Sequence, residues 1–327
     1  MDVAESPDLA ERLAIKGSAD APLLLLLDML GQRGYTFVTP TPASHARVLA
    51  RADRKQAQSL TDVLGWSLPF APQLLDREIR DLLERADAIE AAENGLLRSR
   101  IRVSSLMGDL YLHSSYPTDG RDAVFFGPDS YRFARLIQEE LSREPAGPHA
   151  HILDIGTGAG VGAIVAARHT GVGAATGTDV NPAALRLAAL NARAAGIALH
   201  PVLGDGLDGV ARSIDLALAN PPYIIDEDRR QYRDGGAMLG GALSLQMAES
   251  AVARLAPGGR LILYTGSAIV AGEDMLGSAL ADLAGRSGCS LRYSEIDPDV
   301  FGEELERPAY RDVDRIALVA AILTAPA

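Results

Sequence analysis

The stretch HILDIGTGAG, from His151 to Gly160, decides the fold of this chain. Its apolar first half predicts a short buried strand over residues 151–155. Glycines then recur at every second position, where the strand passes into a helix, and they let a ligand approach the backbone closely. A dinucleotide-binding loop has a further glycine at the position that Val161 occupies, so the fit to a pyrophosphate loop is imperfect.

The same pattern of strand, turn and helix repeats from about residue 119 to residue 327. A second strand should end at Asp179, and a helix should begin at Pro182, a favourable first-turn position. Five further apolar segments predict strands, namely LHPVLGDG, IDLALA, GRLILYTG, CSLRYSEID and DRIALVAAIL. Apolar strands that alternate with helices indicate an α/β fold, with a mainly parallel sheet covered on both faces.

Residues 1–118 differ in pattern and are predicted to form a separate module. Apolar residues at helical spacing predict helices over 20–32, 44–64 and 71–93. Asn94-Gly95 should end the third helix, and strands over 100–104 and 109–113 should pair around Met107-Gly108. Helices followed by a small hairpin favour a mainly helical, winged-helix-like module for substrate binding or dimerisation. The second domain would then cover residues 119–327.

Three aspartates stand at the predicted carboxyl ends of successive strands. Asp154 precedes the glycines, Asp179 ends the second strand and Asp205 ends the third. One such acid is usually a helix cap or a solvated loop residue, but three in consecutive units favour a ligand site. Acids suit a cationic ligand better than a diphosphate, and an acid at Asp179 can bond a ribose diol. Adenosine that carries an amino acid and no phosphate fits this pattern.

The fourth strand is followed by Asn220-Pro221-Pro222-Tyr223, on the same predicted rim. Proline fixes φ and pushes the preceding residue to an extended conformation, so this turn should be stiff. The Asn220 side chain and the Pro221 carbonyl are both acceptors and could grip the two N–H groups of a planar nitrogen. Tyr223 could stack on the planar group. Catalysis would then come from positioning and electrostatics.

Composition narrows the possible partners. The net charge of -12 disfavours broad binding to RNA or to an anionic membrane surface, and no membrane segment is expected. Cys289 is the only cysteine, and the six histidines lack metal spacing, so neither a disulfide nor a metal site is predicted. The acidic N-terminus lacks signal-peptide order, which favours the cytoplasm. Lysine is absent after Lys55, so a P-loop is unsupported in the second domain.

Two groups of arginines are candidate phosphate contacts. Arg98, Arg100 and Arg102 alternate and would share one strand face. Arg229, Arg230 and Arg233 follow the Asn-Pro-Pro-Tyr turn. The favoured interpretation is that these arginines form surface ion pairs with the many acidic residues. This interpretation favours a protein or a small molecule as the acceptor.

The motifs together resemble a class I S-adenosylmethionine-dependent methyltransferase from about Ala123 onward. LDIGTGAG resembles the cofactor loop of that family, GTDVNPAAL its ribose segment and GDG its adenine segment, while NPPYI resembles the acceptor motif of the amino-methylating branch. The resemblance implies a Rossmann-like sheet of seven strands with the last one antiparallel, and S-adenosylmethionine as cofactor.

Within this branch, the chain is most similar to methyltransferases of release-factor or ribosomal-protein glutamine, and also to guanine-N2 methyltransferases of ribosomal RNA. FFGPDSYRF keeps Pro128, Asp129 and Ser130 at the Pro-Glu-Thr positions of the glutamine enzymes, with Gly127 and Tyr131 in place of their Arg and last Glu. The resemblance implies that Asn220, Pro221 and Tyr223 hold the acceptor. The implied cofactor contacts are Phe126, Pro128, Ser130, Asp154, Gly156, Thr157, Gly158, Gly160, Asp179, Val180, Asn181, Asp205, Gly206 and Asn220.

Three hypotheses follow for the function. The first is an N-methyltransferase of a protein glutamine or another macromolecular nitrogen, with a ribosomal RNA base less favoured. The second is an N-methyltransferase of a small metabolite, in which residues 1–118 serve as a lid or a homodimer contact. The third is a non-catalytic regulator that binds the cofactor, against which the intact Asn220-Pro-Pro-Tyr argues.

Overall fold

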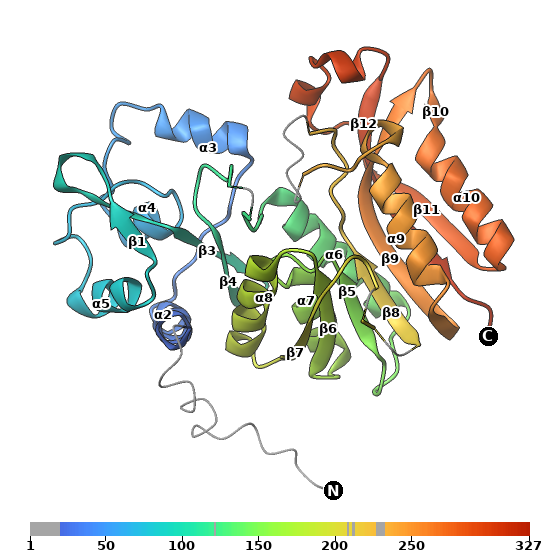
Figure 1. Cartoon of the computed structure of the whole chain (residues 1–327), viewed down its shortest axis with the longest axis horizontal. Helices are drawn as coiled ribbons and strands as arrows, with labels where there is room; N and C mark the ends of the chain where they lie inside the picture. The colour runs from blue at the N-terminus through green and yellow to red at the C-terminus, as the bar shows by residue number, and fades with distance from the viewer. Residues whose placement is uncertain (1–19, 121, 208, 211–212, 227–232) are drawn as a thin grey trace, which may run out of the picture. The chain divides into compact units, whose positions relative to one another are not determined.

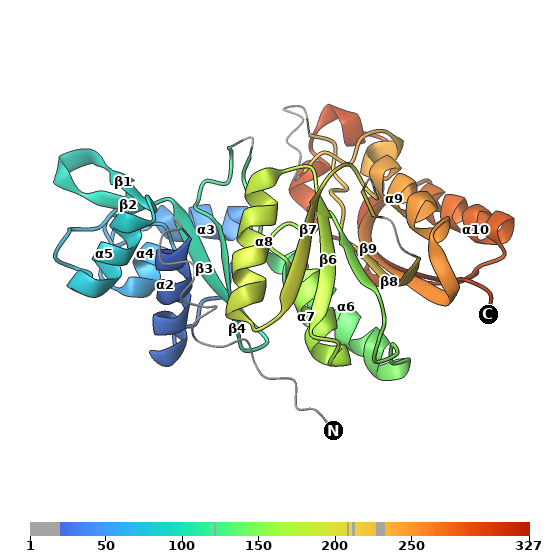
Figure 2. The same cartoon turned by 60° about the horizontal axis from the view of Figure 1, so that its bottom comes forward.

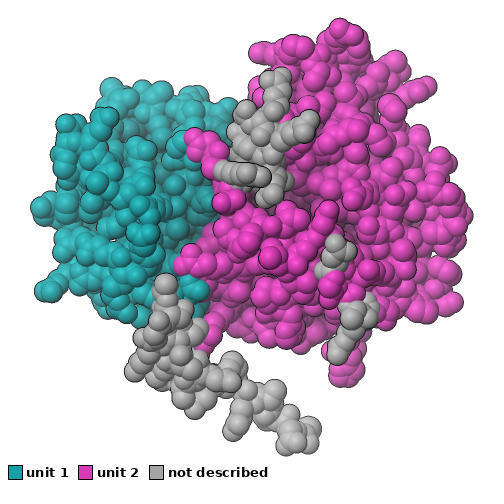
Figure 3. All heavy atoms as spheres, in the orientation of Figure 1, with its two compact units in different colours: residues 1–118 teal, residues 119–327 magenta. Residues whose placement is uncertain are grey.

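The structure is a computed structural model that describes residues 20–120, 122–207, 209–210, 213–226 and 233–327. The chain divides into two compact units, residues 1–118 and residues 119–327 (Figure 3). No helix in the described ranges is both long and apolar enough to cross a membrane.

The second unit is built on one twisted sheet (Figure 1). The strand order is β11-β12-β9-β8-β5-β6-β7, and a two-residue strand, β10, pairs with β9. Strands β5 to β9 are parallel, whereas β12 runs antiparallel to both β9 and β11. The bounds are β5 Ile152–Ile155, β6 Ala174–Asp179, β7 Ala198–Leu203, β8 Ile214–Ala219, β9 Leu255–Val270, β10 Glu273–Asp274, β11 Ser290–Asp297 and β12 Arg315–Thr324. The predicted α/β fold, its seven strands and the antiparallel last strand are confirmed.

Helices cover the sheet because its strands are apolar on both sides. Every residue of β5 is buried, as expected of a central parallel strand. Side chains of α9 and α10 join alternate residues of β5, β8, β9 and β12 in one apolar core. Helix α7 packs on α6, β5 and β6, and α8 lies against β6 and β7 (Figure 2). The bounds are α6 Pro128–Arg143, α7 Val161–Thr170, α8 Pro182–Ala194, α9 Ala242–Val252 and α10 Met275–Ser287.

The first unit combines short helices with two hairpins. Its elements are α2 Ala21–Gln32, α3 Pro42–Leu49, α4 Leu60–Leu64, α5 Arg77–Arg85, β1 Ile89–Ala91, β2 Leu97–Ser99, β3 Ile101–Leu106 and β4 Asp109–Ser114. The hairpin around Met107-Gly108 is present, with positive φ at both turn residues, as a two-residue turn between twisted strands requires. The winged-helix interpretation stays a prediction.

Two helix predictions in this unit were wrong. The single helix over 44–64 is two short helices, because Ser59 adopts an extended conformation and its hydroxyl caps α4 at Asp62 N–H. The helix predicted over 71–93 covers only α5 and gives way to β1. Asn94-Gly95 consequently lies in the turn between β1 and β2, with Asn94 at φ 58°, and ends no α-helix.

The alternating arginines do not share one strand face. Arg98 lies in β2 and Arg102 in β3, and Arg100 falls between the two strands. Arg102 is buried and donates to the carbonyl of Ser114. Arg100 forms ion pairs with Asp87 and Glu90, in line with the interpretation as ion pairs. Arg229 and Arg230 lie outside the described residues.

Candidate active site

A cavity opens at the carboxyl ends of β5, β6 and β8, where parallel strands bring their ends to one edge of the sheet. Residues predicted to contact the cofactor form much of its lining. These are Ser130, Asp154, Gly156, Thr157, Gly158, Asp179, Val180, Asn181, Asp205, Gly206 and Asn220. Phe126, Pro128 and Gly160 were predicted too, but they do not line it.

The glycine loop leaves the floor of the cavity open. Gly156 and Gly158 have φ of +66° and +54°, which favour glycine, and a Cβ on Gly158 would approach only the Gly156 carbonyl, at 4.0 Å. Gly160 has a different task. A Cβ there would lie 3.2 Å from Cα of Ala188, so Gly160 allows α7 to pack closely on α8.

Asp154 is held at the start of α7. Its Oδ2 accepts from the Thr157 hydroxyl at 2.7 Å and from the Ala163 N–H at 2.9 Å. A Cβ on Gly162 would lie 2.5 Å from its Oδ1, so only glycine leaves room for the carboxylate. Burial raises the pKa of Asp154 to about 7, against the effect of these two hydrogen bonds. Asp154 therefore changes charge near neutral pH.

Asp179 fixes the second side of the cavity. Its carboxylate accepts from the N–H groups of Gly158 and Asn181, both at 2.9 Å, and burial raises its pKa. Asn181 caps α8 by accepting from Ala183 N–H. Asp205 is exposed and lines the cavity two residues after β7, which ends at Leu203 rather than at the aspartate.

The Asn-Pro-Pro-Tyr turn lies directly after β8, with Asn220 and Pro222 on the cavity and Pro221 buried behind them. Tyr223 is buried, and its hydroxyl donates to Oδ2 of Asp129 at 2.7 Å. Tyr264 on β9 donates to Oδ1 of the same carboxylate at 2.9 Å. Burial, followed by the charge of Asp129, raises the pKa of Tyr223 well above its ordinary value. Tyr223 is thus a neutral, anchored ring.

Sequence reasoning missed the anchoring role of Asp129, and it missed Phe125 and Met247 in the lining. Phe125 stands three residues before the first residue of α6, and a Cβ on Gly127 would lie 2.5 Å from its ring. The glycine in FFGPDSYRF therefore makes room for Phe125, a signal that only the neighbouring ring explains. Phe126, predicted to contact the cofactor, is fully buried and packs edge-on against Tyr131.

The charge of the cavity distinguishes between ligands. Among the described residues that line it there is no Lys, Arg or His, whereas Asp154, Asp179 and Asp205 are all present. These acidic side chains would repel a diphosphate and attract a cation. In the described ranges no group of His, Cys, Asp and Glu side chains could hold a metal ion.

Comparison with known proteins agrees with this chemistry. The family described as "Methyltransferase small domain" matches residues 132–281. A protein of Cereibacter sphaeroides named release factor glutamine methyltransferase is 35% identical over 277 residues, which cover 80% of this chain and 94% of the relative. The chain belongs to the S-adenosylmethionine-dependent methyltransferases of class I.

Further relatives include one with the same name and one named for ribosomal RNA. A Rhodospirillum rubrum protein named release factor glutamine methyltransferase is 34% identical, over 77% of both chains. The Pseudomonas aeruginosa ribosomal RNA small subunit methyltransferase C is 31% identical, over 65% of this chain and 68% of that one. A solved T. thermophilus 16S rRNA methyltransferase in complex with AdoMet and guanosine has a TM-score of 0.45 and 15% identity, covering 79% of this chain and 64% of its own.

The methyltransferase therefore uses S-adenosylmethionine as its cofactor. Two features of the cavity are compatible with that molecule. The open position above Gly158 leaves room for a ligand to lie against the backbone, and the acidic lining favours a ligand with positive charge.

Proposed function

We propose that this methyltransferase transfers a methyl group to the side-chain amide nitrogen of a glutamine in a protein of translation, of the release-factor class. The observation that carries the proposal is the anchored turn beside the cavity, where Asn220 lines the cofactor space and Tyr223 is fixed by Asp129. The relative from Cereibacter sphaeroides supports the acceptor class, because this chain covers nearly all of its length.

In this proposal the chain's residues bind and orient. Asp154, Gly156 and Gly158 border the methionine part of the cofactor, Asp179 holds the ribose and Asp205 the adenine. Bound S-adenosylmethionine supplies an electrophilic methyl group on a sulfonium. Asn220 Oδ1 and the Pro221 carbonyl accept from the two N–H groups of the acceptor amide, and so aim its nitrogen at that methyl.

The proposed reaction needs no strong base. An amide nitrogen is a poor nucleophile because its lone pair is delocalised, and it becomes acidic once it is methylated. The C–N bond would form as the bond between the methyl carbon and the sulfonium sulfur breaks. The cofactor would leave as a neutral thioether, and one amide proton would pass to water. Tyr223 is neutral, with its pKa well above the ordinary value, so it does not act as a base. Its ring is buried and does not line the cavity, so its proposed role is to fix the turn that presents Asn220 to the amide.

Labelled cofactor tests the proposal. The enzyme is incubated with purified release factors, ribosomes or a metabolite extract, and the label is followed into protein, RNA or small molecules. We expect label on one glutamine of a release factor, and none when that glutamine is replaced. Label only in RNA or only in small molecules would reject the glutamine acceptor. A protein acceptor of translation and the single Cys289 both suit the cytoplasm, which we include in the proposal.

A further inference from the structure

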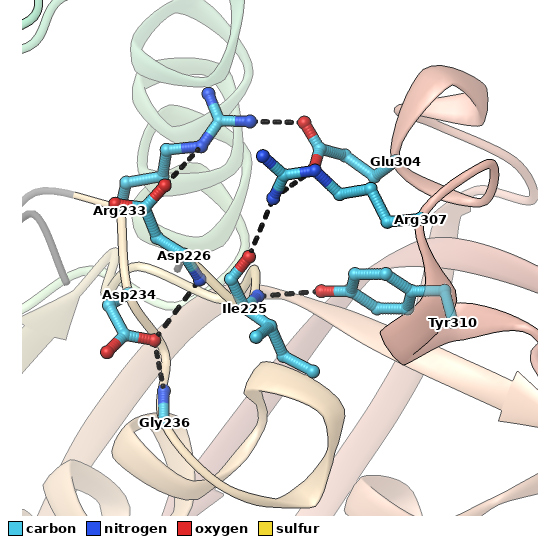
Figure 4. Close-up of polar contacts among 8 residues, drawn as sticks. All are labelled: Ile225, Asp226, Arg233, Asp234, Gly236, Glu304, Arg307 and Tyr310. Carbon is cyan, nitrogen blue, oxygen red and sulfur yellow. Dashed lines mark hydrogen bonds and ion pairs between the residues drawn. The ribbon is translucent and has the colours of Figure 1, made fainter. Parts of the chain in front are cut away.

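The chain between β11 and β12 reaches the loop that follows the Asn-Pro-Pro-Tyr turn. We call residues 301–310 the clasp; it contains two short helices, η3 Gly302–Glu304 and η4 Pro308–Tyr310. Tyr310 Oη accepts from the N–H of Ile225 at 2.7 Å, and Arg307 donates to the carbonyl of Ile225 at 3.0 Å (Figure 4). Both backbone polar groups of Ile225 are thus bound by side chains of the clasp.

A network of charged side chains also joins the clasp to this loop (Figure 4). Glu304 pairs with Arg233, and its Oε2 lies 3.0 Å from Nη1 of Arg307. Arg233 Nε also lies 3.5 Å from Oδ1 of Asp226. Asp226 and Glu304 are 3% and 5% exposed, so these charges are largely removed from water. Buried ion pairs offset the cost of removing their charges from water only when their geometry is good. The network therefore favours one arrangement of the clasp against the loop.

The clasp also reaches the ring of Tyr223. The centroid of the Phe301 ring lies 5.9 Å from that of Tyr223, in an edge contact. Phe301 has φ of 57°, a left-handed conformation that side chains other than glycine rarely adopt. Strained residues persist where the surrounding structure holds them, and they gather at functional sites. The clasp therefore contacts both Tyr223, in the Asn-Pro-Pro-Tyr turn, and Ile225, two residues later.

We propose that Tyr310, Arg307 and Glu304 are positioning residues for methyl transfer. They hold Ile225 while Asp129 holds Tyr223, and together they fix the direction in which Asn220 meets the acceptor. Pro221 and Pro222 have no N–H, so the turn itself has few backbone bonds to hold it. No clasp residue lines the cofactor cavity, so the effect is on the acceptor and not on cofactor binding.

The test uses the full-length enzyme and two variants, Tyr310→Phe and Arg307→Gln. Tyr310→Phe keeps the ring and removes only the oxygen that accepts from Ile225. The matched control is Tyr293→Phe, because the hydroxyl of Tyr293 makes a bond of similar length, 2.6 Å, to Asp274. Hydrogen exchange of the peptide over 223–226 should become at least tenfold faster in both clasp variants and stay unchanged in the control. Calorimetry should give a Kd for cofactor within twofold of wild type.

Activity is measured on whichever acceptor fraction the wild-type enzyme labels. We expect kcat/KM for that acceptor to fall about tenfold in Tyr310→Phe and Arg307→Gln, with no such fall in Tyr293→Phe. Unchanged exchange, unchanged kcat/KM, or an equal fall in the control would each overturn the positioning role. This inference rests on the proposed function only for the identity of the acceptor. If release factors remain unlabelled while another fraction is labelled, the glutamine proposal fails and the clasp is still tested.

Discussion

Asn220 is the residue on which the acceptor chemistry depends. It follows β8 directly, is half-buried and lines the cavity. The sequence predicts this place because two prolines end the apolar strand. Its proposed catalytic role follows from the chemistry of a planar nitrogen held by two acceptors.

Replacing Asn220 by Ala should separate binding from turnover. We expect kcat to fall at least a hundredfold, because one of the two acceptors that orient the nitrogen is lost. The Kd for cofactor should change less than threefold, since Asp154 and Asp179 remain. Single-turnover kinetics and calorimetry measure the two quantities. Turnover equal to wild type would remove Asn220 from the mechanism.

Asp154 should make cofactor binding depend on pH. Burial raises its pKa to about 7 in the free enzyme, and a bound cation favours the ionised carboxylate. The ionised fraction grows as pH rises through 7, so affinity should increase with pH and level off above it. Below pH 7 affinity should fall by up to about tenfold per pH unit.

Calorimetric titrations of S-adenosylmethionine between pH 5.5 and 8.5 measure this profile. The Asp154→Asn variant should bind more weakly at pH 8 and show a flat profile. A wild-type profile as flat as that of the variant would show that Asp154 does not respond to the cofactor.

At the scale of elements, strand β9 packs against the Tyr223 ring of the Asn-Pro-Pro-Tyr turn. The Tyr223 ring lies over Gly266 of β9, and a Cβ there would come within 2.2 Å of ring carbon Cδ2. Tyr264, on the same strand, shares Asp129 with Tyr223. The glycine in GRLILYTG thus has a packing reason that strand patterning alone does not reveal.

Gly266→Ala should displace the Tyr223 ring. We expect a loss of about 1–3 kcal/mol in unfolding free energy from overpacking, together with lower methylation. The control is Gly285→Ala in α10, where an added Cβ meets nothing within 4 Å. That change should be neutral or stabilise the helix by up to about 1 kcal/mol. Denaturant unfolding compares them, and equal effects would contradict the packing role of Gly266.

At the scale of the whole molecule, the first unit has its own buried polar centre. His45 is fully buried, its Nε2 is bonded to the Trp66 carbonyl, and its ring stacks on Tyr116. Burial, followed by the charge of Arg102, lowers the pKa of His45 to about 4. His113 is also buried, and burial and Arg102 lower its pKa as well.

Acid should therefore destabilise the first unit. The unfolded chain binds the His45 proton near pH 6.5 and the folded unit only near 4, so stability is fully present above 6.5 and declines as pH falls toward 4. The shift corresponds to about 3 kcal/mol. Trp66, the single tryptophan, lies beside His45, so its fluorescence reports the unfolding of this unit.

Two histidine variants check the source of the acid effect. His45→Gln should weaken the dependence of unfolding on pH between 4 and 6.5, and the remaining dependence should come from His113. His149→Gln should leave it unchanged, because His149 is exposed. A wild-type unfolding midpoint that is constant over this range would contradict the role of His45.

The sequence by itself determined the second unit and its cavity. Strands β5 and β8 are largely buried, so their mainly apolar sequences and the polar residues at their carboxyl ends can be recognised locally. Because the carboxyl ends of parallel strands lie at one edge of the sheet, the sequence alone predicts that Asp154, Asp179 and Asn220 lie close together. The first unit was harder, because short helices such as α4 depend on tertiary packing more than on a local period.

Only the tertiary structure decided how the site is held. Tyr223 meets Asp129, and Ile225 meets Tyr310, across long separations in sequence. Phe126 and Gly160 do not line the cavity, because Phe126 packs against Tyr131 and Gly160 lies against Ala188 of α8. Strand and helix periods arise from local backbone geometry, whereas a side chain's partner depends on where the rest of the chain arrives. The sequence thus determines which polar residues stand at the ends of the strands, and the tertiary structure determines how their side chains are held.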